Sequence, residues 1–151
     1  MVKRTIKIKN HLHIVEEYVS NGVITPGMLL ALRSDGKVQA HGVAQGKHPR
    51  MFALEDELQG RSISDNYAAT EPVQVMIAQP GEQVYGILKA GQNVAVGDYL
   101  VSGGDGTLIK ASEFVADPLA YPSYWPVGIA LEALDLSGSG AVASHLIVGI
   151  V

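Results

Sequence analysis

Two histidines near the N-terminus, His11 and His13, stand two positions apart and therefore project from one face of a strand. Paired metal ligands occur at this spacing. No third ligand can be assigned, because His41, His48 and His145 are scattered along the chain. We therefore interpret His11 and His13 as solvent-facing side chains of a cationic strand, and we expect no bound metal.

The acidic triplet Glu55-Asp56-Glu57 has residue types suited to acid/base chemistry or to cation binding. A calcium loop, however, arranges its oxygen ligands around an obligatory glycine turn, and no such glycine pattern surrounds the triplet. We expect these residues to form a solvated acidic edge.

The sequence gives little support for a nucleophilic active site or for a phosphate-binding loop. The nearest match to the Gly-x-Ser-x-Gly pattern of hydrolases is the segment 136–141 (LSGSGA), which no helical pattern follows. The glycine-rich segment 103–106 (GGDG) runs into a short β-branched stretch instead of a helix, unlike a phosphate-binding loop. The chain has no cysteine, which excludes a thiol nucleophile. We expect a non-enzymatic protein without a cofactor.

Three aromatic residues, Tyr121, Tyr124 and Trp125, lie close together in the sequence and could stack on a sugar or a base. They alternate with prolines in the segment 113–126, which favours an irregular loop packed against the core. We predict that this loop contacts another protein subunit. A carbohydrate-binding module is the alternative.

Composition and charge narrow the class of protein. The 151 residues are 47% apolar, enough for one main domain with a core, and they contain neither an 18-residue apolar run nor a signal-peptide pattern. The net charge of −4 is uneven, because residues 1–15 hold four basic and no acidic side chains, whereas the remainder holds seven basic and fifteen acidic ones. We expect a soluble protein that contacts neither membranes nor nucleic acid directly.

These residues would be positioned by β-strands, because the sequence pattern predicts strands along almost the whole chain. In residues 5–14 apolar and polar side chains alternate, which predicts a strand with one buried face. We divide the chain into an extended N-terminal arm, residues 1–17, and a β-rich body, residues 18–151. The arm would dock on another chain through six residues: Ile6, Lys7, Ile8, Lys9, Leu12 and Ile14.

Turn signals divide the body into short strands. Residues 28–40 predict a hairpin in which Gly36 supplies a positive φ angle, and residues 55–72 predict a long surface loop. Residues 51–58 fit either a strand or a single helical turn. Further strands are expected within residues 73–78, 84–90, 93–101, 107–111, 127–133 and 145–151.

The hairpin pattern occurs twice. Four residues (Gly27, Leu30, Asp35 and Gly36) match Gly97, Leu100, Asp105 and Gly106 at a constant offset of 70. Residues 52–55 (FALE) match residues 129–132 (IALE) at an offset of 77. We interpret this as a degenerate duplication of a unit that contains a hairpin, a loop and an Ala-Leu-Glu strand.

Residues 88–100 (LKAGQNVAVGDYL) resemble the hairpins of lipoyl and biotinyl carrier domains. Those domains carry their cofactor on a lysine at the tip of a tight turn, in an Asp-Lys-Ala or Met-Lys-Met setting, and this chain has neither sequence. The resemblance supports hairpin geometry, and a lipoyl-like β-domain without cofactor is a further alternative.

Four ordered segments resemble the capsid decoration proteins, or cement proteins, of tailed bacteriophages: residues 52–67 (FALEDELQGRSISDNY), 80–88 (PGEQVYGIL), 96–108 (VGDYLVSGGDGTL) and 128–133 (GIALEA). The resemblance implies a mainly β fold with little helix, in the form of a compact hairpin-rich barrel or β-tulip body. It further implies homotrimers on the outer surface of the virion, at threefold and quasi-threefold sites of the head. The implied partner is the major capsid protein, and the implied role is stabilisation of the expanded head against the pressure of its DNA. The loop with Tyr121, Tyr124 and Trp125 would then contact the capsid or a neighbouring subunit, and a host-attachment module on the virion is the alternative role.

Overall fold

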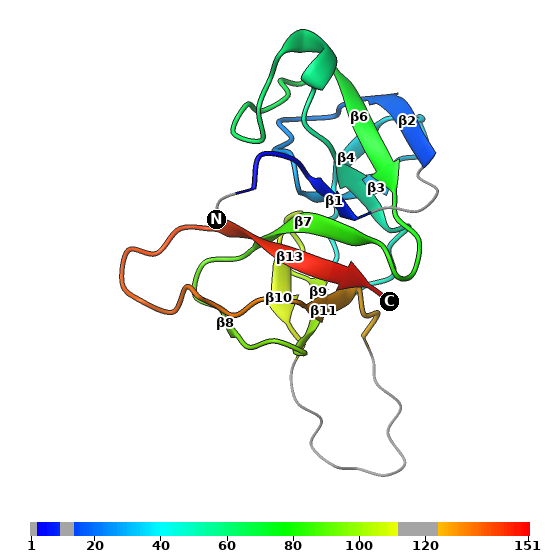
Figure 1. Ribbon diagram of the computed structural model, residues 1–151. Helices are drawn as coiled ribbons and strands as arrows, with labels where there is room; N and C mark the ends of the chain where they lie inside the picture. Colours follow the sequence, from blue (N-terminus) through cyan, green and yellow to red (C-terminus); the bar gives the residue numbers. More distant parts are fainter. Residues whose placement is uncertain (1–2, 10–13, 112–123) are drawn as a thin grey trace.

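The computed structural model describes residues 3–9, 14–111 and 124–151. Within these ranges the chain folds into thirteen β-strands and one short 3-10 helix, η1 (Glu57–Gln59), and contains no α-helix (Figure 1). The predicted fold class, mainly β with little helix, is confirmed. The strands form two barrel-like units that follow one another in the sequence.

The C-terminal unit, residues 83–150, is a closed five-stranded barrel. Its strands are β7 (Gln83–Leu88), β9 (Tyr99–Ser102), β10 (Leu108–Lys110), β11 (Gly128–Ala130) and β13 (Ser144–Ile150). They pair in the order β7-β10-β9-β11-β13, and β13 pairs with β7 to close the ring. All pairs are antiparallel except β10 with β7, which meet in parallel at Leu108 and Leu88.

The N-terminal unit, residues 14–77, repeats this arrangement. Its strands are β2 (Ile14–Val19), β3 (Leu29–Leu32), β4 (Val38–Ala40), β5 (Met51–Ala53) and β6 (Pro72–Ile77). They pair in the order β2-β6-β5-β3-β4. A single parallel bridge between Ser20 and Val38 joins the two ends of this sheet, where the C-terminal unit has its parallel β7–β10 pair.

The two units correspond strand by strand, which confirms the duplication. Shifting β3 and β4 by 70 positions gives the bounds of β9 and β10, and shifting β5 by 77 gives those of β11. The Gly27 N–H donates to the Ala53 carbonyl at 2.8 Å, and the Gly97 N–H donates to the Ala130 carbonyl at 2.8 Å. The repetition of the hairpin and of the Ala-Leu-Glu strand is visible in the sequence. The remaining strands, β2 and β6 in one unit and β7 and β13 in the other, correspond only in how they pair.

A smaller pairing is also repeated. In the C-terminal unit β8 (Asn93–Val94) pairs with β12 (Leu134–Asp135). The N-terminal unit has a single antiparallel bridge at the same place in its topology, between Ile24 and Tyr67.

Strand β5 and the adjoining residues of β3 and β6 are buried, whereas β2 is mostly exposed. Burial on both faces of the central strands explains their continuous apolar runs. Leu30, Met51 and Val75 belong to a core cluster inside that unit. Their neighbours Leu29, Phe52 and Met76 belong to a larger cluster shared with the C-terminal barrel. The packing therefore joins the two units into one body.

Local turn chemistry follows the predictions. Gly36 and Gly106 have φ angles of 81° and 83°, and the preceding aspartates accept equivalent backbone hydrogen bonds, Asp35 from Lys37 at 3.1 Å and Asp105 from Thr107 at 3.2 Å. The ambiguous segment 51–58 contains both expected elements, because it begins as β5 and ends in η1. The expected strand at 93–101 is broken by a turn at Gly97, whose φ angle is 91°.

Candidate functional site

The N-terminal segment lies against its own chain. Strand β1 (Lys7–Lys9) pairs antiparallel with β7, and the Tyr85 N–H donates to the Ile6 carbonyl at 2.8 Å. Ile6 is fully buried, and Ile8 packs against the large core cluster. These two apolar side chains therefore contact the protein's own core.

The other predicted arm residues are placed differently. Lys7 is partly exposed, whereas Ile14 begins β2 and is 49% exposed, although the alternating pattern predicted a buried side chain there. Leu12, like His11 and His13, lies outside the described residues. The predicted boundary at residue 17 falls within β2. That the segment also contacts another protein remains a prediction.

Glu55 anchors this segment. Its Oε2 atom accepts a hydrogen bond from the Ile6 N–H at 3.0 Å, and only 5% of the residue is exposed. The expectation that the whole triplet is a solvated edge is therefore wrong for Glu55. Glu132, its equivalent in the C-terminal unit, accepts a hydrogen bond from the Ile147 N–H at 2.8 Å. In both units the glutamate of the Ala-Leu-Glu strand thus binds the backbone of another strand or segment.

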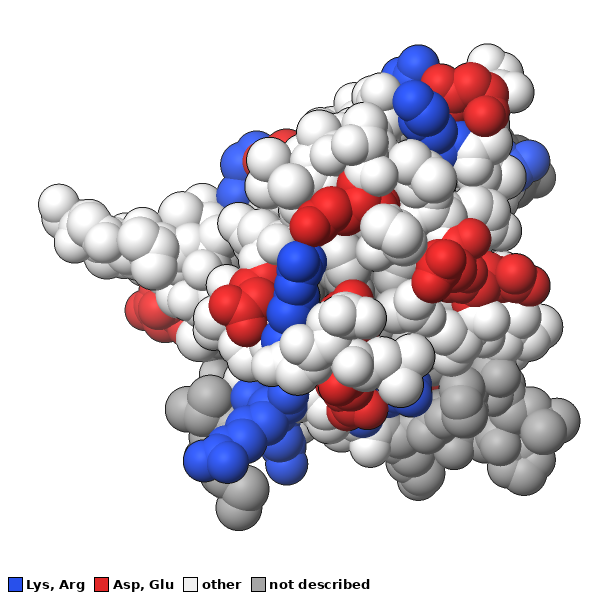
Figure 2. Space-filling view, turned by 90° about the horizontal axis from the view of Figure 1, so that it is seen from above, with Lys and Arg blue, Asp and Glu red and all other residues white. Residues whose placement is uncertain are grey.

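A cleft opens between Glu55 and strand β2, and we call it the acidic cleft. It has a volume of about 130 Å³ and is lined by Lys7, Val15, Leu54, Glu55, Asp56, Glu57, Leu58 and Gln74. Beside it lies a second hollow of about 270 Å³, lined by Glu17, Asp56, Leu58, Gln59, Arg61, Glu71, Pro72 and Gln74. Figure 2 views the molecule from above, and on this face the acidic side chains form several separate groups, some of which lie beside Lys or Arg side chains.

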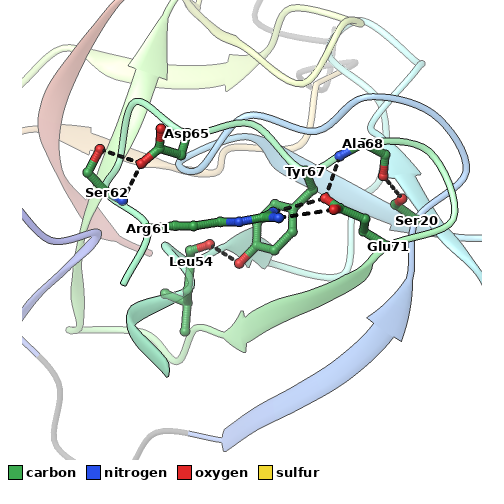
Figure 3. Close-up of polar contacts among 8 residues, drawn as sticks. All are labelled: Ser20, Leu54, Arg61, Ser62, Asp65, Tyr67, Ala68 and Glu71. Atoms are coloured by element: carbon green, nitrogen blue, oxygen red, sulfur yellow. Dashed lines mark hydrogen bonds and ion pairs between the residues drawn. The ribbon is translucent and has the colours of Figure 1, made fainter. Parts of the chain in front are cut away.

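The long connection between β5 and β6 forms one wall of these hollows and is held by an ion pair (Figure 3). The Arg61 guanidinium binds both carboxylate oxygens of Glu71, at 2.9 and 3.0 Å. Glu71 also accepts a hydrogen bond from the Ala68 N–H at 2.7 Å. These hydrogen bonds lower the pKa of Glu71 to about 2, and the one from Arg61 makes the largest contribution.

Three further contacts fix the same connection (Figure 3). The Tyr67 ring is buried, and its hydroxyl donates to the Leu54 carbonyl at 2.7 Å. The Ser20 hydroxyl donates to the Ala68 carbonyl, also at 2.7 Å, and the Ser62 N–H donates to Asp65 at 2.7 Å. Burial raises the pKa of Tyr67 to about 12, so the hydroxyl keeps its proton at neutral pH. The segment 55–72 is therefore a surface loop, as predicted, and side-chain hydrogen bonds and an ion pair hold it in place.

Trp125 lies on a second surface. It is 53% exposed, its backbone N–H donates to the Gln45 carbonyl at 3.0 Å, and the Lys47 ammonium lies 5.4 Å from the ring centroid. Tyr124 is partly buried, and Tyr121 lies outside the described residues. An open groove of about 620 Å³ adjoins Lys47 and includes the exposed side chains of Leu32 and Val43.

Two histidines support this groove, although their separation in the sequence gave no sign of it. The rings of His41 and His48 meet edge to face with centroids 6.2 Å apart. His41 Nε2 lies 2.9 Å from the Lys47 carbonyl, so it donates, and Nδ1 accepts from the Ser102 hydroxyl at 2.7 Å. His48 Nε2 contacts the Pro126 carbonyl at 3.2 Å, and burial is the main cause that lowers the pKa of His48. These rings tie the segment 41–50 to the C-terminal unit.

The polar side chains of the two glycine-rich segments make hydrogen bonds and ion pairs that stabilise their own turns. In the glycine-rich turn Asp105 pairs with Lys89 at 2.9 Å and hydrogen-bonds Thr107. In the Ser-Gly-Ser-Gly turn the Ser137 hydroxyl donates to Asp135 at 2.6 Å. Among the described residues, no three His, Asp or Glu side chains are grouped so as to hold a metal ion, and no helix is long and apolar enough to span a membrane.

The described surface thus offers clefts and exposed strand residues on a duplicated β-barrel scaffold. No model of a protein family matches the chain, and no curated protein matches it. Its fold is similar to a solved structure, the N base of head fiber gp8.5 in bacteriophage phi29. That likeness has a TM-score of 0.53 at 16% sequence identity and covers 93% of this chain and 98% of the other.

Proposed function

We propose that this protein is a non-enzymatic structural component of a phage virion that binds the outer surface of the head. The observation that carries the proposal is the fold likeness to the base of a head fiber, which extends over almost the whole of both chains. The resemblance of residues 52–67, 80–88, 96–108 and 128–133 to decoration proteins supports the same location.

The finer proposal is that of a decoration protein. The chain would bind the major capsid protein as homotrimers at threefold and quasi-threefold sites and would stabilise the expanded head against internal DNA pressure. Exposed apolar side chains such as Leu32, Val43 and Trp125 are available for such contacts. Burial of apolar surface contributes roughly 25 cal/mol per Å², so a few large side chains supply much of the free energy of association.

The roles of the arm and of the aromatic loop belong to this proposal. Because Ile6 and Ile8 pack against the chain's own core, the N-terminal segment would contact a capsid through Lys7, Lys9 and residues near Ile14. Trp125 would lie in the contact between subunits or with the capsid.

The test is a binding assay on expanded heads from the phage that encodes the chain. We expect saturable binding in multiples of three copies and a higher temperature of head disruption once the sites are filled. A K7E/K9E variant should bind more weakly while keeping its fold. Deletion of the segment is a poorer test, because it would also remove the β1 strand that pairs with β7. The absence of binding by the wild-type chain would contradict the proposal.

A second candidate function is glycan binding, which the exposed Trp125 ring beside the groove of about 620 Å³ favours. A glycan array with the full chain and a Trp125→Ala variant separates the two functions. Signal that is lost in the variant would support host attachment, and a blank array would remove this candidate.

A further inference from the structure

The duplication makes a direct comparison of β2 with β7 possible. Each is the first strand of its unit and pairs along its length with the last strand of that unit, β6 and β13 respectively. At its C-terminal end each meets a parallel neighbour, through Ser20–Val38 in one unit and Leu88–Leu108 in the other.

The two strands differ at their N-terminal ends. In β7, Gln83 and Val84 pair with β1 on the outer edge. In β2 the corresponding residues are Ile14 and Val15, and no described strand pairs with them except β6. An unpaired edge of this kind presents N–H and C=O groups to which an extended chain can add.

The chemistry of β2 differs from that of a protected edge strand. Ile14, Val15 and Val19 are exposed apolar side chains, whereas natural edges usually carry lysine or proline against unwanted pairing. The charges on this strand are both acidic, Glu16 and Glu17. The edge therefore suits an incoming strand that carries apolar and basic side chains.

The acidic cleft lies on one face of this edge. Val15 lines the cleft and Glu17 lines the adjoining hollow, so alternate residues of β2 face the same side. Gln74 of β6 lines both hollows and donates to Glu17 at 2.8 Å. A strand added beside β2 would project every second side chain toward this face.

Glu55 provides an independent sign of a ligand. Its Oε2 atom is used by the Ile6 N–H, but its Oε1 atom is buried and has no hydrogen-bond partner among the described residues. A buried carboxylate oxygen without a donor is costly, and a charged donor from a bound chain would satisfy it. With Asp56 and Glu57 beside it, the lining of the cleft carries three carboxylates against one ammonium group, that of Lys7.

We propose that the outer edge of β2 binds an extended segment of the head-shell protein, which pairs with the strand backbone and places a lysine or arginine side chain in the acidic cleft at Glu55. That the segment belongs to the head shell rests on the proposed function. The pairing itself rests on the geometry of β2 and on the charge of the cleft.

The surface is tested without heads by titrating the full chain with the peptide Ac-KRTIKIK-NH2, which has the chemistry that β7 accepts from β1. We expect amide shift changes in NMR spectra for residues 14–19 and 55–58. A peptide with each lysine replaced by glutamate should bind at least tenfold more weakly. Changes confined to residues 83–85 would mean exchange with β1 and would overturn the proposal.

Backbone pairing is tested with two N-methylated peptides, one methylated at the two isoleucines and the other at the threonine and the second lysine. A strand uses alternate N–H groups toward one neighbour, so one of these peptides should lose at least tenfold in affinity and the other should not. Equal binding by both would show that side chains alone make the contact and would contradict the proposal.

The cleft is tested with Glu55→Gln, which keeps an oxygen acceptor for Ile6 and removes the charge. We expect about tenfold weaker peptide binding, the size of one charge-assisted hydrogen bond. The matched control is Glu132→Gln, which makes the equivalent change in the C-terminal barrel and should bind as wild type. Thermal unfolding of both variants checks that neither result comes from misfolding.

The source of the segment is tested on heads. If wild-type chain binds heads and Glu55→Gln binds them about tenfold more weakly, the proposal is supported. If both bind equally, it is overturned while the proposed function stands. If the wild-type chain does not bind heads, the proposed function and the assigned source both fail, and the peptide titration alone decides the surface. Self-association that Glu55→Gln abolishes would identify a second copy as the occupant and would also overturn the proposal.

Discussion

The backbone N–H of Ile6 donates a hydrogen bond to the carboxylate of Glu55, 49 residues further along the chain, at a distance of 3.0 Å. Both residues are buried, and the adjacent Ile6 carbonyl accepts from the Tyr85 N–H. One side chain of the N-terminal unit therefore holds the N-terminal segment in place on the C-terminal barrel.

Replacing Glu55 with alanine should destabilise the protein by about 2 kcal/mol, because the buried Ile6 N–H would lose its acceptor. Denaturant unfolding measures the free energy, and amide hydrogen exchange should show the largest loss of protection at residues 6–9. Glu55→Gln is the control and should lose much less. Equal losses in both variants would contradict this role for the acceptor.

Gly27 and Gly97 give a matched pair, since both have left-handed φ angles, 96° and 91°, and both make the same hydrogen bond. A methyl group at Gly27 would lie 2.8 Å from the Tyr85 carbonyl oxygen, whereas at Gly97 nothing lies within 4 Å. We expect Gly97→Ala to cost about 1 kcal/mol from the backbone alone. Gly27→Ala should cost about 3 kcal/mol, because a clash is added. Unfolding free energies check the difference, and a reversed order would contradict the packing.

The pair Arg61–Glu71 predicts a stability change in acid. The pKa of Glu71 falls from its ordinary 4.5 to about 2, so its contribution is present above pH 4.5 and is lost as the pH falls toward 2. Glu71→Gln should therefore lower the melting temperature at pH 6 and have little effect near pH 2. A carboxyl titration by NMR that gives Glu71 an ordinary pKa would contradict this.

His145 predicts a change at milder acidity. Its ring stacks on Tyr85 with centroids 5.0 Å apart, its Nε2 donates to the Pro26 carbonyl at 2.8 Å, and burial lowers its pKa below 6.5. A depressed histidine pKa stabilises the fold above pH 6.5, and that contribution is lost as the pH falls below this value. The melting temperature of the wild-type chain should fall between pH 7 and 5, and a His145→Gln variant should show a smaller fall. Parallel curves would contradict the assignment to His145.

Much of the architecture could be predicted because it depends on local chemistry. Gly36 and Gly106 require positive φ angles, and each aspartate before them hydrogen-bonds the backbone two residues later. These turns identified both hairpins and, at their offset of 70, the duplication. The outer strands β2 and β7 gave no such signal, because one is exposed and the other is buried, and their sequences have diverged accordingly.

The candidate site was much less predictable. The acidic triplet is visible in the sequence. The sequence does not show that Glu55 is buried, with one carboxylate oxygen lacking a hydrogen-bond partner among the described residues, while Glu57 is exposed. His41 and His48 stand seven positions apart with no common motif, and only the fold brings their rings together beside Lys47 and Trp125.

The sequence by itself determined the mainly β fold, the two hairpins and their repetition, because turn residues and apolar periodicity act over a few neighbouring positions. Only the tertiary structure decided which strand edges are paired and which stay open. That choice depends on contacts between residues as distant as Ile6 and Glu55, and the burial of a side chain or strand edge is set by the segments that the fold brings against it.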